Sequence, residues 1–261
     1  MTGPERIAAA FASSGKRAAL MPYLMGGFPD PDASRAIGEA YADAGADLVE
    51  LGVPFSDPLA DGPVIQAAGT AALAAGATVG STLELAAGLA RRVPVVVMCY
   101  ANLILARGVD DFAGVLAKAG VSGLIVPDLP LEEAGALLEA CDARGIALVP
   151  LVAPTTPDDR LAEIGARARG FLYTVSLSGT TGERAALGGG LRDVLERASA
   201  GTDVPVAVGF GISTPEQAAA AADAGADGVI VGSRLVRAAA EAADPPAAVG
   251  ALVRELAAAL R

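Results

Sequence analysis

The chain contains 261 residues, of which 53% are hydrophobic, and 32 glycines and 17 prolines supply many turns, so a disordered protein is not expected. Nineteen basic against 30 acidic residues give a net charge of −11, which disfavours a nucleic-acid or anionic-membrane partner. The absence of histidine excludes a Ser-His-Asp triad and a His-ligated catalytic metal, so acid/base chemistry must come from carboxylates, tyrosines or cysteines.

Two further features bear on location. The longest uncharged stretch, 62–83, holds few large aliphatic residues, and the apolar run at 7–12 is too short for a secretory signal. Cys99 and Cys141 lack the CxxC spacing of a zinc or redox motif and fit a reducing compartment. We therefore expect a cytoplasmic protein with no membrane span and no metal.

Short β-rich segments alternate with segments of helical spacing about every thirty residues, the pattern of parallel βα units. The strands are predicted at 18–25, 47–52, 94–100, 123–126, 147–152, 171–175, 205–208 and 228–231. The helices that follow them are predicted at 31–44, 63–75, 109–119, 131–143, 157–168, 191–200, 214–224 and 233–243, with extra helices at 81–90 and 246–260.

An internal repeat supports this count, because the sequence Asp-Ala-Gly-Ala-Asp precedes the predicted strands at both 43–47 and 223–227. An open doubly wound sheet would show the same repeat. Eight units fill the chain, however, and no G-x-G-x-x-G follows the first strand, which favours a TIM (β/α)₈ barrel of the α/β class with extra helices. We expect residues 1–261 to form a single domain.

Two carboxylates belong to the second predicted unit. Glu50 ends a strand that should be buried on both faces, where an apolar environment would raise its pKa and suit it to both donate and accept a proton. A glutamate in a rim salt bridge is the alternative. Asp61 follows in the proline-rich loop; alone it would be read as a helix cap, but beside Glu50 it suggests an acid/base pair.

Glycine-rich loops follow the last predicted strands. Gly211 lies after the seventh strand, and Gly232 and Ser233 open a helix after the eighth, which together predict a phosphate site. The long loop from Ser176 to Arg184 predicts a lid, with a disordered surface loop as the alternative. Cys99 is more simply a packing residue.

The sequence as a whole resembles the α subunit of tryptophan synthase. The motifs that carry the resemblance span nearly the whole chain: 22–24, 50–63, 100–102, 127–130, 178–182 and 209–213. Two positions depart from the family: Met25 stands where a small hydroxyl residue is usual, and Leu177 stands where some members have arginine. Neither departure removes a catalytic group.

The resemblance implies a lyase of tryptophan biosynthesis that cleaves indole-3-glycerol phosphate to indole and glyceraldehyde 3-phosphate. Glu50 would protonate the indole ring carbon, and Asp61 would accept a hydrogen bond from the indole N–H. Thr181 on the closing loop would engage Asp61. The phosphate would be held by Gly182, Gly211, Gly232 and Ser233, and the indole pocket would be lined or flanked by Tyr23, Tyr100, Tyr173 and Phe210.

The resemblance also implies a partner, a β subunit in an α₂β₂ heterotetramer that binds pyridoxal phosphate, whereas this chain would hold no cofactor. The implied contact residues are Pro54, Phe55, Ser56, Asp57, Asn102 and Pro130. Two alternatives remain open: a free-standing indole-3-glycerol-phosphate lyase, and a non-catalytic subunit that binds the phosphate ligand and regulates a partner.

Overall fold

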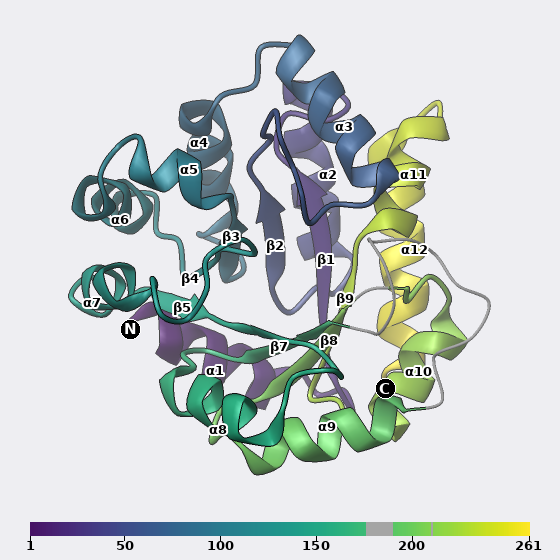
Figure 1. Ribbon diagram of the computed structural model, residues 1–261. Coiled ribbons are helices and arrows are strands. Elements are labelled where there is room, and N and C mark those ends of the chain that lie inside the picture. Colours follow the sequence, from purple (N-terminus) through teal and green to yellow (C-terminus); the bar gives the residue numbers. More distant parts are fainter. Residues whose placement is uncertain (176–189, 210) are drawn as a thin grey trace.

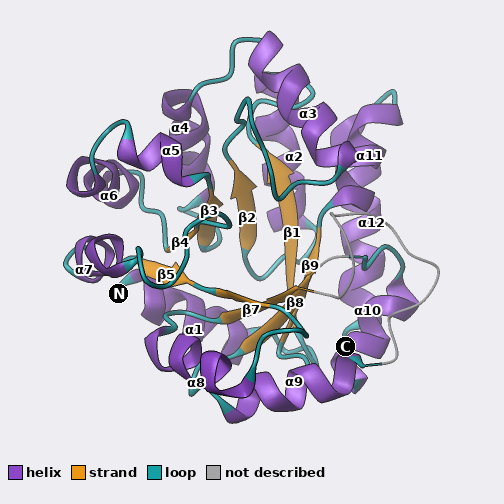
Figure 2. Ribbon diagram, viewed as in Figure 1, coloured by secondary structure: helices purple, strands orange, loops and turns teal. Residues whose placement is uncertain are grey.

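The computed structural model describes residues 1–175, 190–209 and 211–261. Within these ranges the strands form one parallel sheet of nine strands in the order β5-β4-β3-β2-β1-β9-β8-β7-β6, surrounded by helices (Figures 1 and 2). The strands are β1 (Ala19–Met25), β2 (Val49–Gly52), β3 (Val95–Met98), β4 (Gly123–Ile125), β5 (Ala147–Val149), β6 (Leu151–Val152), β7 (Leu172–Val175), β8 (Val206–Gly209) and β9 (Gly228–Val231).

Pro150 lies between β5 and β6, the first and last strands of the sheet order, and so joins the two edges of the sheet into a barrel. A single strand was predicted over 147–152, but the structure divides it, so that β5 pairs with β4 while β6 pairs with β7. Proline has no N–H to continue a ladder. Its carbonyl still accepts a hydrogen bond from the Tyr173 N–H at 3.1 Å. The continuous-strand prediction is therefore wrong at one residue, and the (β/α)₈ barrel fold is confirmed.

The helices lie outside the strands, as expected where parallel strands are joined by crossovers (Figure 2). They are α1 (Gly3–Ser13), α2 (Pro31–Asp43), α3 (Pro63–Ala74), α4 (Val79–Leu89), α5 (Ala101–Leu105), α6 (Val109–Lys118), α7 (Gly135–Asp142), α8 (Asp158–Arg167), α9 (Leu191–Ala200), α10 (Pro215–Asp223), α11 (Ser233–Glu241) and α12 (Pro245–Ala259). The sequence analysis missed α1 and α5, and it began α7 at 131, four residues too early.

Helix α1 covers the end of the barrel at which the strands begin. Its Ile7 is fully buried with the barrel interior, and Phe11 packs against Phe171 with ring centroids 5.9 Å apart. A capping box between Thr2 and Glu5 starts the helix. Thr-x-x-Glu is a readable helix-start signal, so the sequence did contain the information for α1.

Both copies of the repeated Asp-Ala-Gly-Ala-Asp segment lie at this same end. Asp47 accepts a hydrogen bond from the Leu20 N–H at 2.7 Å, and Asp227 accepts one from the Val206 N–H at 2.8 Å. In each copy the last aspartate therefore joins the start of its own strand to a neighbouring strand. Lys16 adds an ion pair to Asp47 at 2.8 Å, with both side chains nearly buried.

No individual helix in the described ranges is both long enough and apolar enough to span a membrane. Helices α3 and α4 reach that length and composition only when taken together, and they are bent by 107° relative to one another.

Candidate active site

Glu50 lies on β2 at the end of the barrel where the strands finish. The register places it beside Tyr23 of β1 and Val96 of β3. Its side chain is 2% exposed, and Oε2 has no hydrogen-bond partner among the described residues. Burial, with a smaller contribution from the charge of Asp61, raises the pKa of Glu50 to about 8. The rim alternative is wrong, and the carboxyl is held protonated at neutral pH.

Asp61 lies in the loop between β2 and α3 and is 5% exposed. Burial raises its pKa to about 6, and a hydrogen bond with Tyr100 limits the rise. The loop backbone is fixed on both sides, because the Asp61 N–H donates to the Pro58 carbonyl and the Gln66 amide donates to the Asp61 carbonyl. The cap of α3 is Gly62, without a side-chain cap bond, so Asp61 is not the helix cap.

Tyr100, just after β3, holds this loop to the barrel. Its hydroxyl accepts a hydrogen bond from the Ala60 N–H at 3.1 Å, and its ring stacks on Phe55 with centroids 5.3 Å apart. Asp128 accepts from the Ala101 N–H at 2.9 Å and so fixes the residue next to Tyr100. The sequence analysis did not assign a role to Asp128, although its position after a predicted strand was a usable signal.

Two further tyrosines point into the barrel, and each needs a glycine beside it. A Cβ on Gly52 would lie 2.0 Å from the Tyr23 hydroxyl, and a Cβ on Gly209 would lie 2.3 Å from the Tyr173 hydroxyl. Both tyrosines are buried, and the charges of Glu50 and Asp61 add to the rise of their pKa values. The site is therefore two carboxylates within a tyrosine-lined, low-dielectric chamber.

The loops after β8 and β9 complete this end of the barrel. Gly211 has a φ of 85°, a left-handed conformation that favours glycine. Gly232 is the cap of α11, and Ser233 is its first residue, so N–H groups at the start of this helix have no partner within it. The predictions for Thr181, Gly182 and Phe210, the lid at 176–184 and the departure at Leu177 lie outside the described residues.

The residues predicted to contact a partner lie on three nearby segments. Most of them are available at the surface: Phe55 is half-buried, and the exposed members are Ser56, Asp57, Asn102 and Pro130. Pro54 is buried. The segments are linked to the site, because Phe55 stacks on Tyr100 and Asn102 follows it by two residues.

The remaining candidate residues are packing residues. Cys99 is fully buried in the cluster between sheet and helices, which confirms its packing role. Met25 packs with Tyr23 and Ile65, and its sulfur lies 3.9 Å from the Tyr23 hydroxyl. Across the described part of the chain, no group of three or more acidic or cysteine side chains is arranged to hold a metal ion.

The family model described as "Tryptophan synthase alpha chain" matches residues 10–260. The tryptophan synthase alpha chain of Methanosarcina acetivorans is 50% identical over 241 residues, which is 92% of this chain and 88% of the relative. That of Gloeobacter violaceus is 49% identical over 247 residues, covering 93% and 90%.

Solved structures agree with these sequence matches. A structure of Mycobacterium tuberculosis tryptophan synthase has a TM-score of 0.91 at 42% identity and covers 98% of both chains. The tryptophan synthase subunit alpha of Legionella pneumophila has a TM-score of 0.88 at 35% identity, covering 100% of this chain and 98% of the other. The similarity in sequence and in fold therefore extends over almost the full chain.

Proposed function

The chain belongs to the tryptophan synthase alpha chain family and catalyses the alpha reaction of that enzyme, and we propose that Glu50 and Asp61 are the groups that carry out its chemistry. The alpha reaction is the retro-aldol cleavage of indole-3-glycerol phosphate to indole and glyceraldehyde 3-phosphate, a lyase step in tryptophan biosynthesis. The observation that carries the proposal is Glu50, a buried carboxyl whose Oε2 has no hydrogen-bond partner among the described residues and whose pKa is about 8.

In this proposal the proton balance closes on Glu50. Its protonated carboxyl donates to the indole ring carbon that bears the glycerol phosphate chain, which converts the ring into an electron acceptor. The resulting Glu50 carboxylate then takes the proton from the adjacent side-chain hydroxyl. The bond from the ring carbon to the chain breaks, its electron pair returns to the ring, and indole and the aldehyde are released.

Asp61 acts in its ionised form. With a pKa of about 6 it is largely a carboxylate at neutral pH, where it accepts a hydrogen bond from the indole N–H and stabilises the positive charge on the protonated ring. Tyr100 holds Asp61 in place, and Tyr23 and Tyr173 enclose the ring. The phosphate is assigned to Gly211, Gly232 and Ser233, together with Gly182; Thr181 and Phe210 are assigned to the closing loop and the ring pocket.

We propose that a β subunit docks on Phe55, Ser56, Asp57, Asn102 and Pro130, with Pro54 behind them, in an α₂β₂ heterotetramer. Two large apolar side chains near these residues support this assignment, since Leu59 is 84% exposed and Leu105 is 64% exposed. Pyridoxal phosphate is assigned to the partner, which uses the released indole. The two free, buried cysteines are consistent with a location in the reducing cytosol.

The first experiment measures indole release from indole-3-glycerol phosphate by the purified chain, with and without a β subunit. Slow release alone and a large increase with the partner would support the full proposal. Fast release that does not depend on the partner would identify a free-standing lyase, the second candidate. Absence of release in both conditions, with the phosphate analogue still bound, would indicate a regulatory subunit and remove the assigned roles of Glu50 and Asp61.

A further inference from the structure

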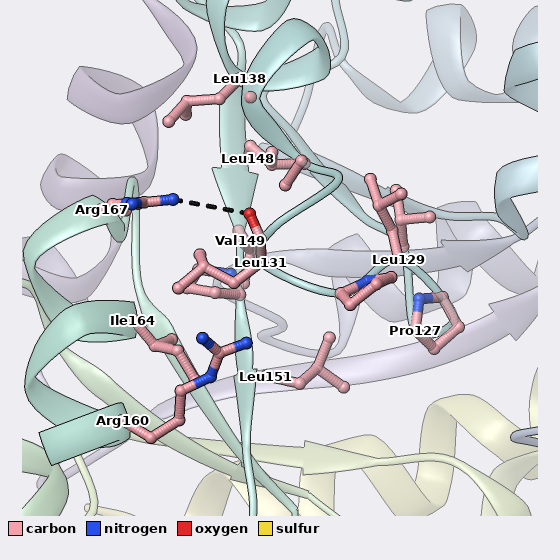
Figure 3. Close-up of a pocket in the computed structure, with 15 residues that line it drawn as sticks. Pro127, Leu129, Leu131, Leu138, Leu148, Val149, Leu151, Arg160, Ile164 and Arg167 are labelled. Atoms are coloured by element: carbon pink, nitrogen blue, oxygen red, sulfur yellow. Dashed lines mark hydrogen bonds between the residues drawn. The ribbon is translucent and has the colours of Figure 1, made fainter. Parts of the chain in front are cut away.

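A cavity of about 230 Å³ lies outside the barrel chamber, where α7 and α8 flank the strand interruption at Pro150. Figure 3 shows leucines around most of it, with Leu131 and Leu148 near the centre and Leu129 on the side opposite α8. None of the residues assigned to the chemistry lines this cavity, although Pro130 of the proposed partner-contact surface lies at its edge. It is therefore separate from the proposed active site.

The backbone explains why this space is not filled. Helix α7 begins only at Gly135, and the residue before it is Ala134, so the turn that faces the cavity carries almost no side chain. A Cβ built on Gly135 would meet no atom within 4 Å. Leu148 and Leu151, which line the cavity, are only half-buried, although most strand residues of the barrel are fully covered.

Two arginines of α8 form one wall, and ion pairs hold them there. Arg160 pairs with Glu132 at 2.6 Å and with Glu163 at 3.2 Å. Arg167 pairs with Glu163 at 3.4 Å and donates to the Leu131 carbonyl at 3.5 Å, the bond drawn in Figure 3. The cavity therefore combines an aliphatic lining with two positioned cations and one weakly engaged carbonyl.

We propose that this cavity is a second binding site for an indole-class aromatic ring, which rests on the proposed function because indole is the product of that reaction. An aliphatic cavity of about 150 Å³ stays dry and accepts benzene, so a cavity of about 230 Å³ has room for a fused two-ring aromatic. A guanidinium over an aromatic face favours an electron-rich ring above an alkane of equal size.

The carbonyl adds selectivity for a ring N–H. The Leu131 oxygen has two lone pairs and accepts from the Arg167 guanidinium at 3.5 Å and from the Ala134 N–H at 3.3 Å. Because both bonds are long, an indole N–H can replace one of them. A phosphate group is not required here. The site selects free indole rather than the phosphorylated substrate, because the two arginines are already paired with carboxylates.

Equilibrium dialysis of radiolabelled indole against the full chain tests this proposal. A non-cleavable indole-alkyl phosphate analogue is present at saturation, so that it occupies the barrel chamber. We expect one indole to bind per chain beyond the analogue. Gly135→Leu fills the cavity from a helical position with ordinary backbone geometry, and it should weaken this binding by more than about tenfold.

Gly88→Leu is the matched control, because Gly88 is also helical with open space at its Cβ but lies on α4, away from the cavity. It should bind indole as the wild type does. Leu138→Phe fills the cavity from another position of α7 and replaces Gly135→Leu if that variant fails to fold. No extra indole in the wild type, or unchanged binding in a folded cavity-filled variant, would overturn the proposal.

Cleavage of indole-3-glycerol phosphate is assayed on the same samples. A wild type without cleavage activity would refute the proposed function, while the dialysis result would still report on the cavity itself. Folded Gly135→Leu should retain the wild-type rate of cleavage at low indole concentration, because the substitution lies outside the chamber.

Discussion

The buried carboxylates at the two ends of the barrel differ in their hydrogen-bond and ion-pair partners. Where the strands begin, Asp47 is paired with Lys16 and with the Leu20 N–H. Where the strands end, Glu50 has an Oε2 without a hydrogen-bond partner among the described residues, and the nearby Asp61 carries a like charge. Burial raises the pKa at both ends, but only Asp47 has a cation and an N–H that lower it again.

This difference separates a structural carboxylate from a functional one. An acid that joins two strands stabilises the folded state when its bonds are complete. An acid buried without partners costs stability, so its presence calls for a role in chemistry. In a barrel that role belongs at the end where the strands finish, which is where Glu50 lies.

The largest effect is expected from Glu50→Gln, which keeps the shape of the side chain but removes the proton. The rate constant for cleavage should fall by about 10³-fold or more, since acid and base steps both use this group. Binding of the non-cleavable analogue should stay close to that of the wild type. Parallel loss of binding and of folding would instead make Glu50 a structural residue, like Asp47.

The same substitution should also stabilise the fold at high pH. The folded-state pKa of about 8 lies above the ordinary 4.5, so the folded protein keeps a proton that the unfolded chain has released. Stability contributed by this group is therefore present below about pH 4.5 and is lost as the pH rises toward 8. Glu50→Gln should gain roughly 4 kcal/mol in urea unfolding at pH 8 and almost nothing at pH 4.

Sequence patterns identified the barrel but not this contrast between its ends. Periodicity and glycine placement predicted the strand positions well, because covered parallel strands are apolar throughout. Glu50 and Asp47 each stand beside large aliphatic residues in the sequence, and only the folded chain shows that Lys16 reaches Asp47. Helix α5 was missed because it has only five residues, and its first N–H, that of Ala101, is bound by Asp128 from another loop.

A second prediction concerns Asp61, whose ionised form should be needed together with protonated Glu50. The rate constant should therefore be highest between about pH 6 and pH 8. Asp61→Asn should lower the rate constant by about 10²-fold and abolish the fall of the rate constant on the acid side of its pH profile. Because the Asp61 charge raises the pKa of Glu50, the remaining alkaline limb should move to lower pH. An alkaline limb that stays in place would show that the two carboxylates are not coupled.

A third prediction tests the opposite end of the barrel. Lys16→Met leaves Asp47 nearly buried without its cation, and the free energy of unfolding should fall by about 3 kcal/mol. The cleavage rate constant should be unchanged in the folded variant. Adding Asp47→Asn should recover part of the loss, because no unpaired charge is then buried. A fall in the rate constant at constant fold would place catalytic function at both ends.

The smallest effect is expected at Ser233, on the phosphate side of the chamber. Ser233→Asp adds a negative charge to the first residue of α11, whose free N–H groups attract an anion. The new carboxylate competes with the substrate phosphate, so KM should rise by about tenfold while the rate constant for bound substrate changes little. Ser233→Asn introduces a side chain of the same size as Asp but without a charge, so its KM should stay within a few-fold of the wild-type value. If both variants keep the wild-type KM, the phosphate is not held at α11, and the carboxylates of β2 and of the loop after it would then be the part of the chamber that fixes the substrate.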